Sequence, residues 1–406
     1  MQVSPSLAAR SLASAVMPPR ADNDDASAVT LLQELLEQAI ALRSSDLHFE
    51  PYEERYRVRF RIDGVLQEKM ALPLALRERL VARIKVLARL DISERRLPQD
   101  GRIKFSLGPE RMVDLRVSTL PTLFGEKVVI RVLDATHVGL DMEALGYPAG
   151  DQMLLEEAIA RPHGMVLVTG PTGSGKTSTL YTTLKQLATR EVNLCTVEDP
   201  IEMIEPAFNQ MQVHHNIDLT FASGIRALLR QDPDIIMIGE IRDQETAEMA
   251  IQAALTGHLV LSTLHTNDAP SAISRLQELG IAHYLIKATL IGVMAQRLVR
   301  LLCPHCKRAV NAPEPVHEAI GCGECRDSGY QGRAGLYEIM VMDETLKALI
   351  TPGADVQALR RASLGQGMRT LRMAGIDKVH AGLTTLAEVL RVTPGDSETN
   401  DLMVAP

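Results

Sequence analysis

The sequence contains no tryptophan, and aromatic residues make up only 3% of its 406 residues. Stacking of bases on aromatic side chains is how many proteins bind single-stranded nucleic acid, so this scarcity counts against such a fold. The formal net charge of −8 also argues against broad, nonspecific binding to nucleic acid. We therefore expect no nucleic acid among the partners of this protein.

Long apolar runs are also missing. No uninterrupted run of about 18 or more apolar residues occurs, so the sequence predicts no transmembrane helix. The first twenty residues lack an apolar core of the length that a signal peptide needs. We interpret them as part of a disordered tail; a segment that binds a membrane surface or a partner is the alternative. The chain has five cysteines, four of them in two CxxC pairs, which indicates metal ligation in a reducing, cytoplasmic compartment.

The spacing of apolar residues predicts two folded parts. The first combines a helix, a strand of alternating apolar and arginine residues over 56–62, a second helix and three further strands, which together form an α+β domain. The second has short apolar runs separated by helical segments, which is typical of a parallel sheet covered on both faces. These runs lie at 165–169, 193–197, 235–239 and 259–263.

The predicted organisation is a disordered tail (1–27), an N-terminal α+β domain (28–135), a linker (136–148), an α/β domain (149–299), a cysteine-rich segment (300–335), a helical C-terminal region (336–395) and a polar tail (396–406).

The strongest local signal is a phosphate-binding loop that matches the pattern GxxxxGK[ST] in full. An apolar strand precedes the loop and a helical segment follows it, as the motif requires. Backbone N–H groups of such a loop surround phosphate oxygens at the positive end of a helix. Lys176 would neutralise the β- and γ-phosphates of ATP, and the Thr177 hydroxyl would ligate Mg²⁺. The loop consists of Gly170, Pro171, Thr172, Gly173, Ser174, Gly175, Lys176 and Thr177.

Acidic residues follow two of the buried strands. Glu240 comes after the strand at 235–239, at the sheet edge where ligands of α/β folds bind. It is our candidate for polarising the attacking water or organising it around Mg²⁺; a solvated carboxylate at a strand end is the alternative. Glu198 belongs to a second acidic cluster, for which support of Mg²⁺ or water and a turn of solvated acids are both open. His265 could sense the γ-phosphate; a structural role is the alternative.

Four cysteines form two pairs separated by fifteen residues: Cys303, Cys306, Cys322 and Cys325. This spacing suits one tetrahedral Zn²⁺ with four thiolate ligands, and such a closed site is structural. Four free thiols or two disulfides are the alternatives.

These motifs, taken in order, resemble those of the ATPases of type II secretion (general secretory pathway protein E) and of type IV pilus assembly. The resemblance covers about residues 28–395. Its carriers are the segments GPTGSGKT, TVEDPIE, DPDIIMIGEIRD and GHLVLSTLHTND, together with SSDLHFEP, LPQDGRI and the CxxC pairs. Pilus retraction ATPases generally lack the cysteine quartet, which counts against that branch.

The resemblance implies a RecA-like P-loop ATPase domain preceded by a small PAS-like domain. It also implies a homo-hexamer that binds nucleotide between the two domains and works on inner-membrane platform and adaptor proteins, to which it attaches peripherally. Besides Lys176, the P-loop domain shows no evident cation committed to the transferred phosphoryl group. The arginines that match family arginines are Arg116 and Arg131, from the N-terminal domain, and Arg226, Arg230 and Arg242, near the nucleotide or the subunit interface.

Two functions within the family stay open, pseudopilus assembly in type II secretion and assembly of type IV pili. A nucleic-acid translocase and a scaffold that does not hydrolyse ATP are the alternatives outside it. Full-length relatives carry a further N-terminal domain that docks onto an inner-membrane partner, whereas this sequence has only a short tail there. We therefore expect either a truncated chain or another means of recruiting the partner.

Overall fold

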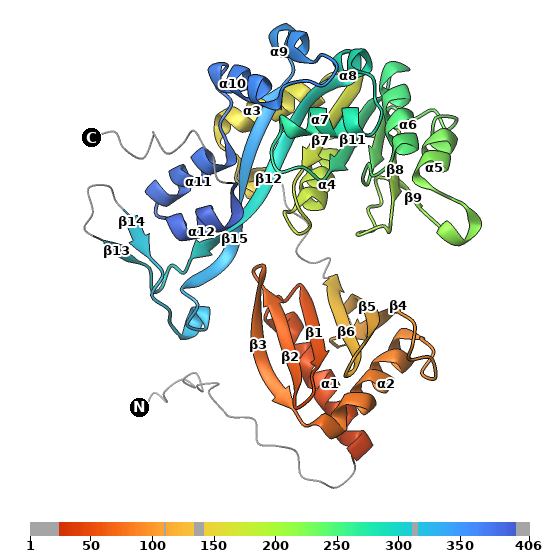
Figure 1. Ribbon diagram of the computed structural model, residues 1–406, viewed down its shortest axis with the longest axis vertical. Coiled ribbons are helices and arrows are strands. Elements are labelled where there is room, and N and C mark those ends of the chain that lie inside the picture. The colour runs from red at the N-terminus through yellow and green to blue at the C-terminus, as the bar shows by residue number, and fades with distance from the viewer. Residues whose placement is uncertain (1–23, 109–110, 134–141, 311–315, 395–406) are drawn as a thin grey trace, which may run out of the picture. The chain divides into compact units, whose positions relative to one another are not determined.

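The computed structural model describes residues 24–108, 111–133, 142–310 and 316–394 (Figure 1). The chain divides into two compact units, Met1–Asp134 and Ala135–Pro406. This division lies at the predicted start of the linker, whose first part, 136–141, is outside the described residues. The two predicted tails are also largely outside them.

The first unit is a six-stranded antiparallel sheet with two helices against one face (Figure 1). Its strand order is β3-β2-β1-β6-β5-β4. Alternate residues of β2, β5 and β6 point into one apolar core together with the apolar faces of α1 and α2. The elements are α1 (Asp24–Ala41), β1 (Asp46–Pro51), β2 (Tyr56–Ile62), β3 (Val65–Leu72), α2 (Arg77–Ala88), β4 (Gln99–Ser106), β5 (Met112–Thr122) and β6 (Gly125–Leu133).

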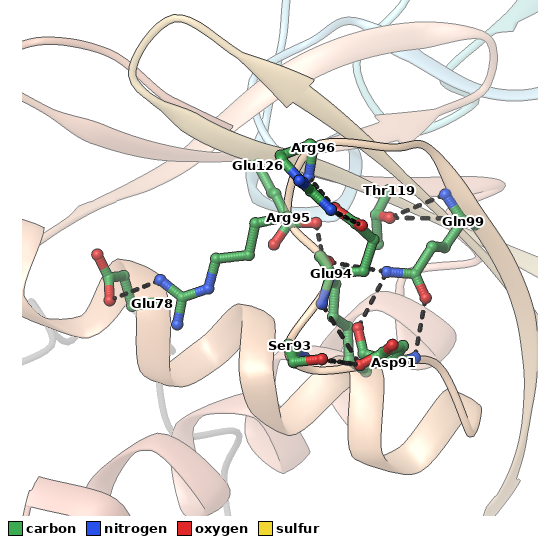
Figure 2. A network of polar contacts seen from close by, with 10 residues as sticks. Glu78, Asp91, Ser93, Glu94, Arg95, Arg96, Gln99, Thr119 and Glu126 are labelled. Atoms are coloured by element: carbon green, nitrogen blue, oxygen red, sulfur yellow. Dashed lines mark hydrogen bonds and ion pairs between the residues drawn. The ribbon is translucent and has the colours of Figure 1, made fainter.

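A polar network orders the loop between α2 and β4 (Figure 2). The side-chain amide of Gln99 donates to the carbonyl oxygens of Asp91 and Glu94, each at 3.0 Å. Asp91 Oδ1 accepts from the backbone N–H of Ser93 at 2.8 Å, which forms a tight turn. Gln99, the glutamine of the LPQDG segment, therefore stabilises the loop that precedes it. Its side chain supplies hydrogen bonds that the backbone would supply in a helix or strand.

The second unit is built on a seven-stranded sheet with the order β15-β12-β7-β11-β10-β8-β9. Every neighbouring pair is parallel except β12 and β15, which run antiparallel. Separate apolar clusters cover the two faces, as a parallel sheet requires. The strands are β7 (Gly164–Thr169), β8 (Leu194–Glu198), β9 (Asn209–Gln212), β10 (Ile235–Ile238), β11 (Leu259–Leu264), β12 (Leu290–Leu302) and β15 (Tyr330–Val341).

Helices cover both faces of this sheet (Figure 1). They are α3 (Ala149–Ile159), α4 (Lys176–Leu187), α5 (Phe221–Leu228), α6 (Gln244–Leu255), α7 (Ser271–Glu278), α8 (His283–Thr289), α9 (Glu344–Leu349), α10 (Val356–Gly365), α11 (Leu371–His380) and α12 (Leu386–Val392). Among the described helices, none has the length and apolar character needed to cross a membrane.

The sheet extends beyond the predicted limits of the α/β domain. β12 continues past residue 299, and β15 pairs with it along most of its length. The expectation of a helical region from residue 336 was wrong for its first part, because β15 runs to Val341 and the next helix begins at Glu344. The sequence of β15 does not indicate a strand, because its partly exposed first half contains glycine and arginine. Its buried second half shows no alternation of apolar and polar residues.

Candidate nucleotide site and cysteine cluster

The phosphate-binding loop connects a buried strand to a helix. β7 ends at Thr169 and α4 begins at Lys176, and all six residues of β7 are buried. The turn between them has positive φ angles of 149° at Gly170, 79° at Gly173 and 89° at Gly175. Residues with a Cβ atom rarely adopt such angles. The glycines of the motif are therefore required by the path of the backbone itself.

Space is also limited where the loop meets β12. A Cβ atom at Gly170 would lie 2.5 Å from the carbonyl oxygen of Gln296, and one at Gly175 would lie 2.9 Å from its Nε2. The Ser174 hydroxyl is buried and has no hydrogen-bond partner among the described residues, while Thr177 is exposed in the first turn of α4. A side-chain-free cradle, an unsatisfied hydroxyl and a helix N-terminus fit a bound phosphate.

Lys176 turns back onto the loop that it follows. Its ammonium group donates to the carbonyl oxygens of Gly170 at 2.8 Å and Pro171 at 3.1 Å. Burial lowers the pKa of Lys176 to about 8; the Glu240 carboxylate opposes this shift and the Arg297 charge adds to it. The lysine is thus a buried cation whose proton is held less firmly than in water.

Glu240 lies among cations at the end of β10. Its carboxylate forms an ion pair with Arg242 and lies 3.3 Å from Nε2 of His265. The Glu240 side chain is 14% exposed. The structure therefore brings Lys176, Glu240, His265 and Arg242 together at one edge of the sheet.

Glu198 has a different environment. It is the last residue of β8 and is only 3% exposed. Its carboxylate accepts hydrogen bonds from Tyr181 at 2.6 Å, Thr196 at 2.6 Å and Gln210 at 3.2 Å. These bonds tie α4, β8 and β9 together. Neutral donors thus satisfy this carboxylate inside the protein.

Arg226 and Arg230 contact groups outside the phosphate loop. Arg226, on α5, forms an exposed ion pair with Glu245 of α6 at 3.3 Å. Arg230 follows the helix and donates to the carbonyl oxygen of Arg226 at 2.8 Å. Neither of these two contacts involves the phosphate-binding residues.

Arg116 and Arg131 belong to the first unit and stand opposite each other on β5 and β6. They lie on the sheet face away from the core, because the neighbours of Arg116 at 115 and 117 point into it. Nε of Arg131 donates to Oδ1 of Asp46 at 3.2 Å, and Arg61 pairs with the same carboxylate at 3.4 Å. Asp46 therefore offsets the repulsion between neighbouring arginines.

Two residues beside the phosphate loop were missed by the sequence analysis. Gln296 and Arg297 lie on β12, which pairs with β7. The Gln296 side chain accepts from Thr179 of α4 at 2.8 Å, and Arg297 donates to the Gln296 carbonyl oxygen at 2.9 Å. This unit thus has a further buried cation beside the loop, and its hydrogen bonds go to backbone carbonyl groups. That no cation besides Lys176 is committed to the transferred phosphoryl group stays a prediction. The sequence did offer a signal, because Gln296 and Arg297 are two consecutive polar residues within an otherwise apolar run.

The four cysteines form one cluster at the end of the β12–β15 ribbon. Their sulfur atoms all lie within 4.8 Å of one another, an arrangement that can hold a metal ion. Backbone N–H groups of Cys322 and Gly329 donate to the Cys325 sulfur, each at 3.2 Å. Such donors stabilise thiolates, which is the form that binds metal.

Known proteins resemble this chain over most of its length. The family model described as type II/IV secretion system protein matches residues 21–391. The type IV pilus assembly ATPase TfpB of Acinetobacter baylyi is 52% identical over 392 residues, which cover 92% of this chain and 66% of that protein. Type II secretion system protein E of Pseudomonas aeruginosa is 50% identical over 384 residues, which cover 91% and 76%.

A solved structure is similar as well. The crystal structure of the pilus retraction motor PilT with bound ADP aligns with a TM-score of 0.62 and 25% identity, covering 91% of this chain and 99% of that one. This agrees with the mixed α/β fold and its largely parallel sheet. The chain spans about two thirds of the length of TfpB and about three quarters of the secretion protein. It belongs to the type II/IV secretion system protein family, the family of the ATPases of type II secretion and type IV pilus assembly.

Proposed function

We propose that this chain is an ATP-hydrolysing motor that powers pseudopilus assembly in type II protein secretion. The proposal depends on one observation: four ionisable side chains lie close together beside a phosphate-binding loop. They are Lys176, Glu240, His265 and Arg242. Assembly of type IV pili is the second candidate, favoured by the 52% identity to a pilus assembly ATPase. Both candidates use the same site and differ in the machine that receives the motion.

The phosphate loop, Gly170 to Thr177, would hold the phosphates of ATP. Lys176 would exchange its two carbonyl contacts for phosphate oxygens, because a full negative charge attracts the ammonium group more strongly than a carbonyl dipole does. The Thr177 hydroxyl would hold Mg²⁺, which offsets negative charge on the phosphates when it is bound. The Ser174 hydroxyl would gain a partner in the same cradle.

Glu240 would orient the attacking water by accepting its proton in a hydrogen bond. The ion pair with Arg242 keeps a cation beside this carboxylate. His265 lies next to the same carboxylate and would respond to the γ-phosphate. For Glu198 we favour support of this edge through Tyr181 of α4 over direct contact with Mg²⁺ or water, because its acceptor sites already receive three bonds.

The remaining charge stabilisation would come from assembly. In this proposal the second unit is a RecA-like ATPase domain and the first is a PAS-like domain that brings Arg116 and Arg131 to the phosphates. A homo-hexamer would place Arg226, Arg230 and Arg242 near a nucleotide or a subunit interface. The guanidinium fork matches phosphate oxygens in two directions, which makes arginine effective in this role.

The motor would act in the cytoplasm, held peripherally at the inner membrane by platform and adaptor proteins of the secretion or pilus machine. Nucleic acid is not part of this function. The predicted linker, 136–148, would let the two domains move relative to each other as ATP is hydrolysed.

The test of the motor is the dependence of turnover on assembly and on the two arginines. We expect ATPase activity per chain to rise with protein concentration. Arg116→Ala or Arg131→Ala should lower turnover on the order of 10³-fold, with a much smaller change in ATP affinity. Arg55→Ala, at an exposed position of the same domain, is the control and should keep activity. Full activity in a monomer, or unchanged turnover in both variants, would contradict this design.

For the cysteine cluster we propose one structural Zn²⁺. Four sulfurs at about 2.3 Å from one zinc ion in a tetrahedron lie about 3.8 Å apart. The sulfur of Cys322 lies 3.9 Å from that of Cys303 and 3.7 Å from that of Cys325. Elemental analysis of protein purified without added metal should find about one zinc per chain. Protein without metal whose four thiols all react freely in the folded state would exclude this site.

A further inference from the structure

Arg297 is a buried cation whose guanidinium links its own strand to a loop of the candidate site. It lies on β12 and is only 6% exposed. One end of its guanidinium donates to the carbonyl oxygen of Gln296 at 2.9 Å, and the other donates to the carbonyl oxygen of Asn267 at 2.8 Å. The Gln296 carbonyl group belongs to β12 and the Asn267 carbonyl group to the segment that follows β11, so a single planar group links a strand to a loop.

The Gln296 end lies directly beside the phosphate loop. The carbonyl oxygen of Gln296 is 2.5 Å, and Nη1 of Arg297 3.1 Å, from the position that a Cβ atom would take on Gly170. The Gln296 side chain continues the contact to Thr179 in the first turn of α4. Movement of Arg297 would therefore displace the backbone against which the loop rests.

The Asn267 end belongs to residues 265–269, which follow β11 and which we name the histidine loop. It begins with His265, the neighbour of Glu240. A second contact joins it to β7, because Thr266 N–H donates to the Thr169 hydroxyl at 2.8 Å. Arg297 and Thr169 thus hold the histidine loop at two points, both next to Gly170, where the phosphate loop begins.

The far side of the histidine loop is held by charged groups. Asp268 forms an ion pair with Arg360 of α10 at 2.7 Å. Glu338 of β15 accepts from the backbone N–H of Ala269 at 2.8 Å. Burial lowers the pKa of Arg297, and both of these acidic groups oppose that shift. A buried cation is stable only where such compensation exists, so the cluster supports one position of this guanidinium.

We propose that Arg297 is a positioning residue that fixes the histidine loop against the phosphate loop, and so sets where His265 lies relative to Glu240. The inference rests on the proposed ATPase function. Arg297 touches neither reacting atom in this arrangement and acts through the two carbonyl groups. Its loss should therefore affect the rate of hydrolysis much more than the binding of nucleotide, since small misplacements of catalytic groups cost large factors in rate.

The test compares two substitutions of Arg297 with a matched control. Arg297→Gln removes charge and fork, whereas Arg297→Lys keeps the charge but can satisfy only one of the two carbonyl groups well. We expect turnover to fall about 10- to 100-fold in both, with ADP affinity within about threefold of wild type. Arg300→Gln alters an arginine of the same strand that pairs with Glu388, and should keep the wild-type rate at a temperature where it is folded.

A double-variant measurement separates positioning from a general structural role. If Arg297 acts through the histidine loop, adding Arg297→Lys to His265→Ala should cost little further turnover. Independent, multiplicative losses would overturn the inference, as would normal turnover in Arg297→Lys or equal losses of rate and ADP affinity. Should Arg297→Gln fail to fold, Arg297→Lys carries the test. An inactive wild-type hexamer would instead refute the proposed function, so the two failures are distinguishable.

Discussion

Glu240 and Glu198 follow neighbouring strands of one sheet, yet their surroundings differ in kind. Glu198 is buried and accepts hydrogen bonds from a tyrosine, a threonine and a glutamine. Glu240 is partly exposed and pairs with a histidine and an exposed arginine. A carboxylate whose acceptor sites are filled by neutral donors holds the structure together. One that faces charges at an open edge keeps acceptor capacity for a ligand or water.

The difference follows from the elements beside each strand. β8 has β9 as its next neighbour, and Gln210 of β9 and Tyr181 of α4 enclose Glu198. β10 is followed instead by a turn that leads into α6, which leaves Glu240 beside the histidine loop. Both carboxylates therefore occupy the same kind of position, the end of a strand. The elements beside each strand determine the role of its carboxylate.

Substituting each of the two glutamates by glutamine should show the largest difference between them. Glu240→Gln removes the acceptor of the water proton, so we expect turnover to fall about 10²- to 10⁴-fold while ADP binding is kept. Glu198→Gln should instead lower stability by about 1–3 kcal/mol, because the new amide cannot accept from both Tyr181 and Thr196. Steady-state turnover, ADP titration and thermal unfolding of both variants measure the contrast.

Each variant serves as the control of the other. Both substitutions keep the shape of the side chain and remove one negative charge, so a difference between them reports environment. Near-normal turnover in Glu240→Gln would remove that residue from its assigned role. A loss of turnover in Glu198→Gln at unchanged stability would show that Glu198, too, contributes directly to hydrolysis.

What the sequence could predict follows from how local each signal is. The phosphate loop could be predicted because the positive φ angles of a single turn require its glycines. The strands β7, β8, β10 and β11 were readable as short apolar runs. Glu240 was found because the end of a parallel strand marks the ligand edge of such a sheet.

Other features depend on contacts between distant segments. Arg297 is 127 residues from Gly170 in sequence, and their proximity requires β12 to pair with β7. The saturation of Glu198 requires Gln210 and Tyr181 from two other elements. β1 and β15 carry polar residues on their faces, so their apolar pattern is weak. Strand order and side-chain neighbours are properties of the folded sheet, which spacing along the chain does not encode.

The charge on Lys176 offers a finer distinction between the two glutamates. Its pKa of about 8 reflects burial and the Arg297 charge, partly offset by Glu240. Because this value lies below the ordinary 10.5, the unfolded chain binds more protons between pH 8 and 10.5. Lys176 therefore opposes folding below pH 8, and this cost is lost as the pH rises towards 10.5. A bound phosphate reverses the effect, since it favours the protonated lysine.

Nucleotide affinity should consequently depend on pH in the alkaline range. ADP binds the protonated lysine, so we expect its affinity to be constant from about pH 7 to 7.5 and to fall by up to about tenfold per pH unit above pH 8. The Glu240 charge raises the pKa of Lys176, so Glu240→Gln should shift the midpoint to lower pH. Glu198→Gln should leave it in place, because Glu198 does not contribute to the pKa of Lys176. ADP titrations of the wild type and both variants from pH 7 to 9.5 measure the midpoints. Equal midpoints in the two variants would show that the two carboxylates act equally on the Lys176 charge, which would contradict the prediction.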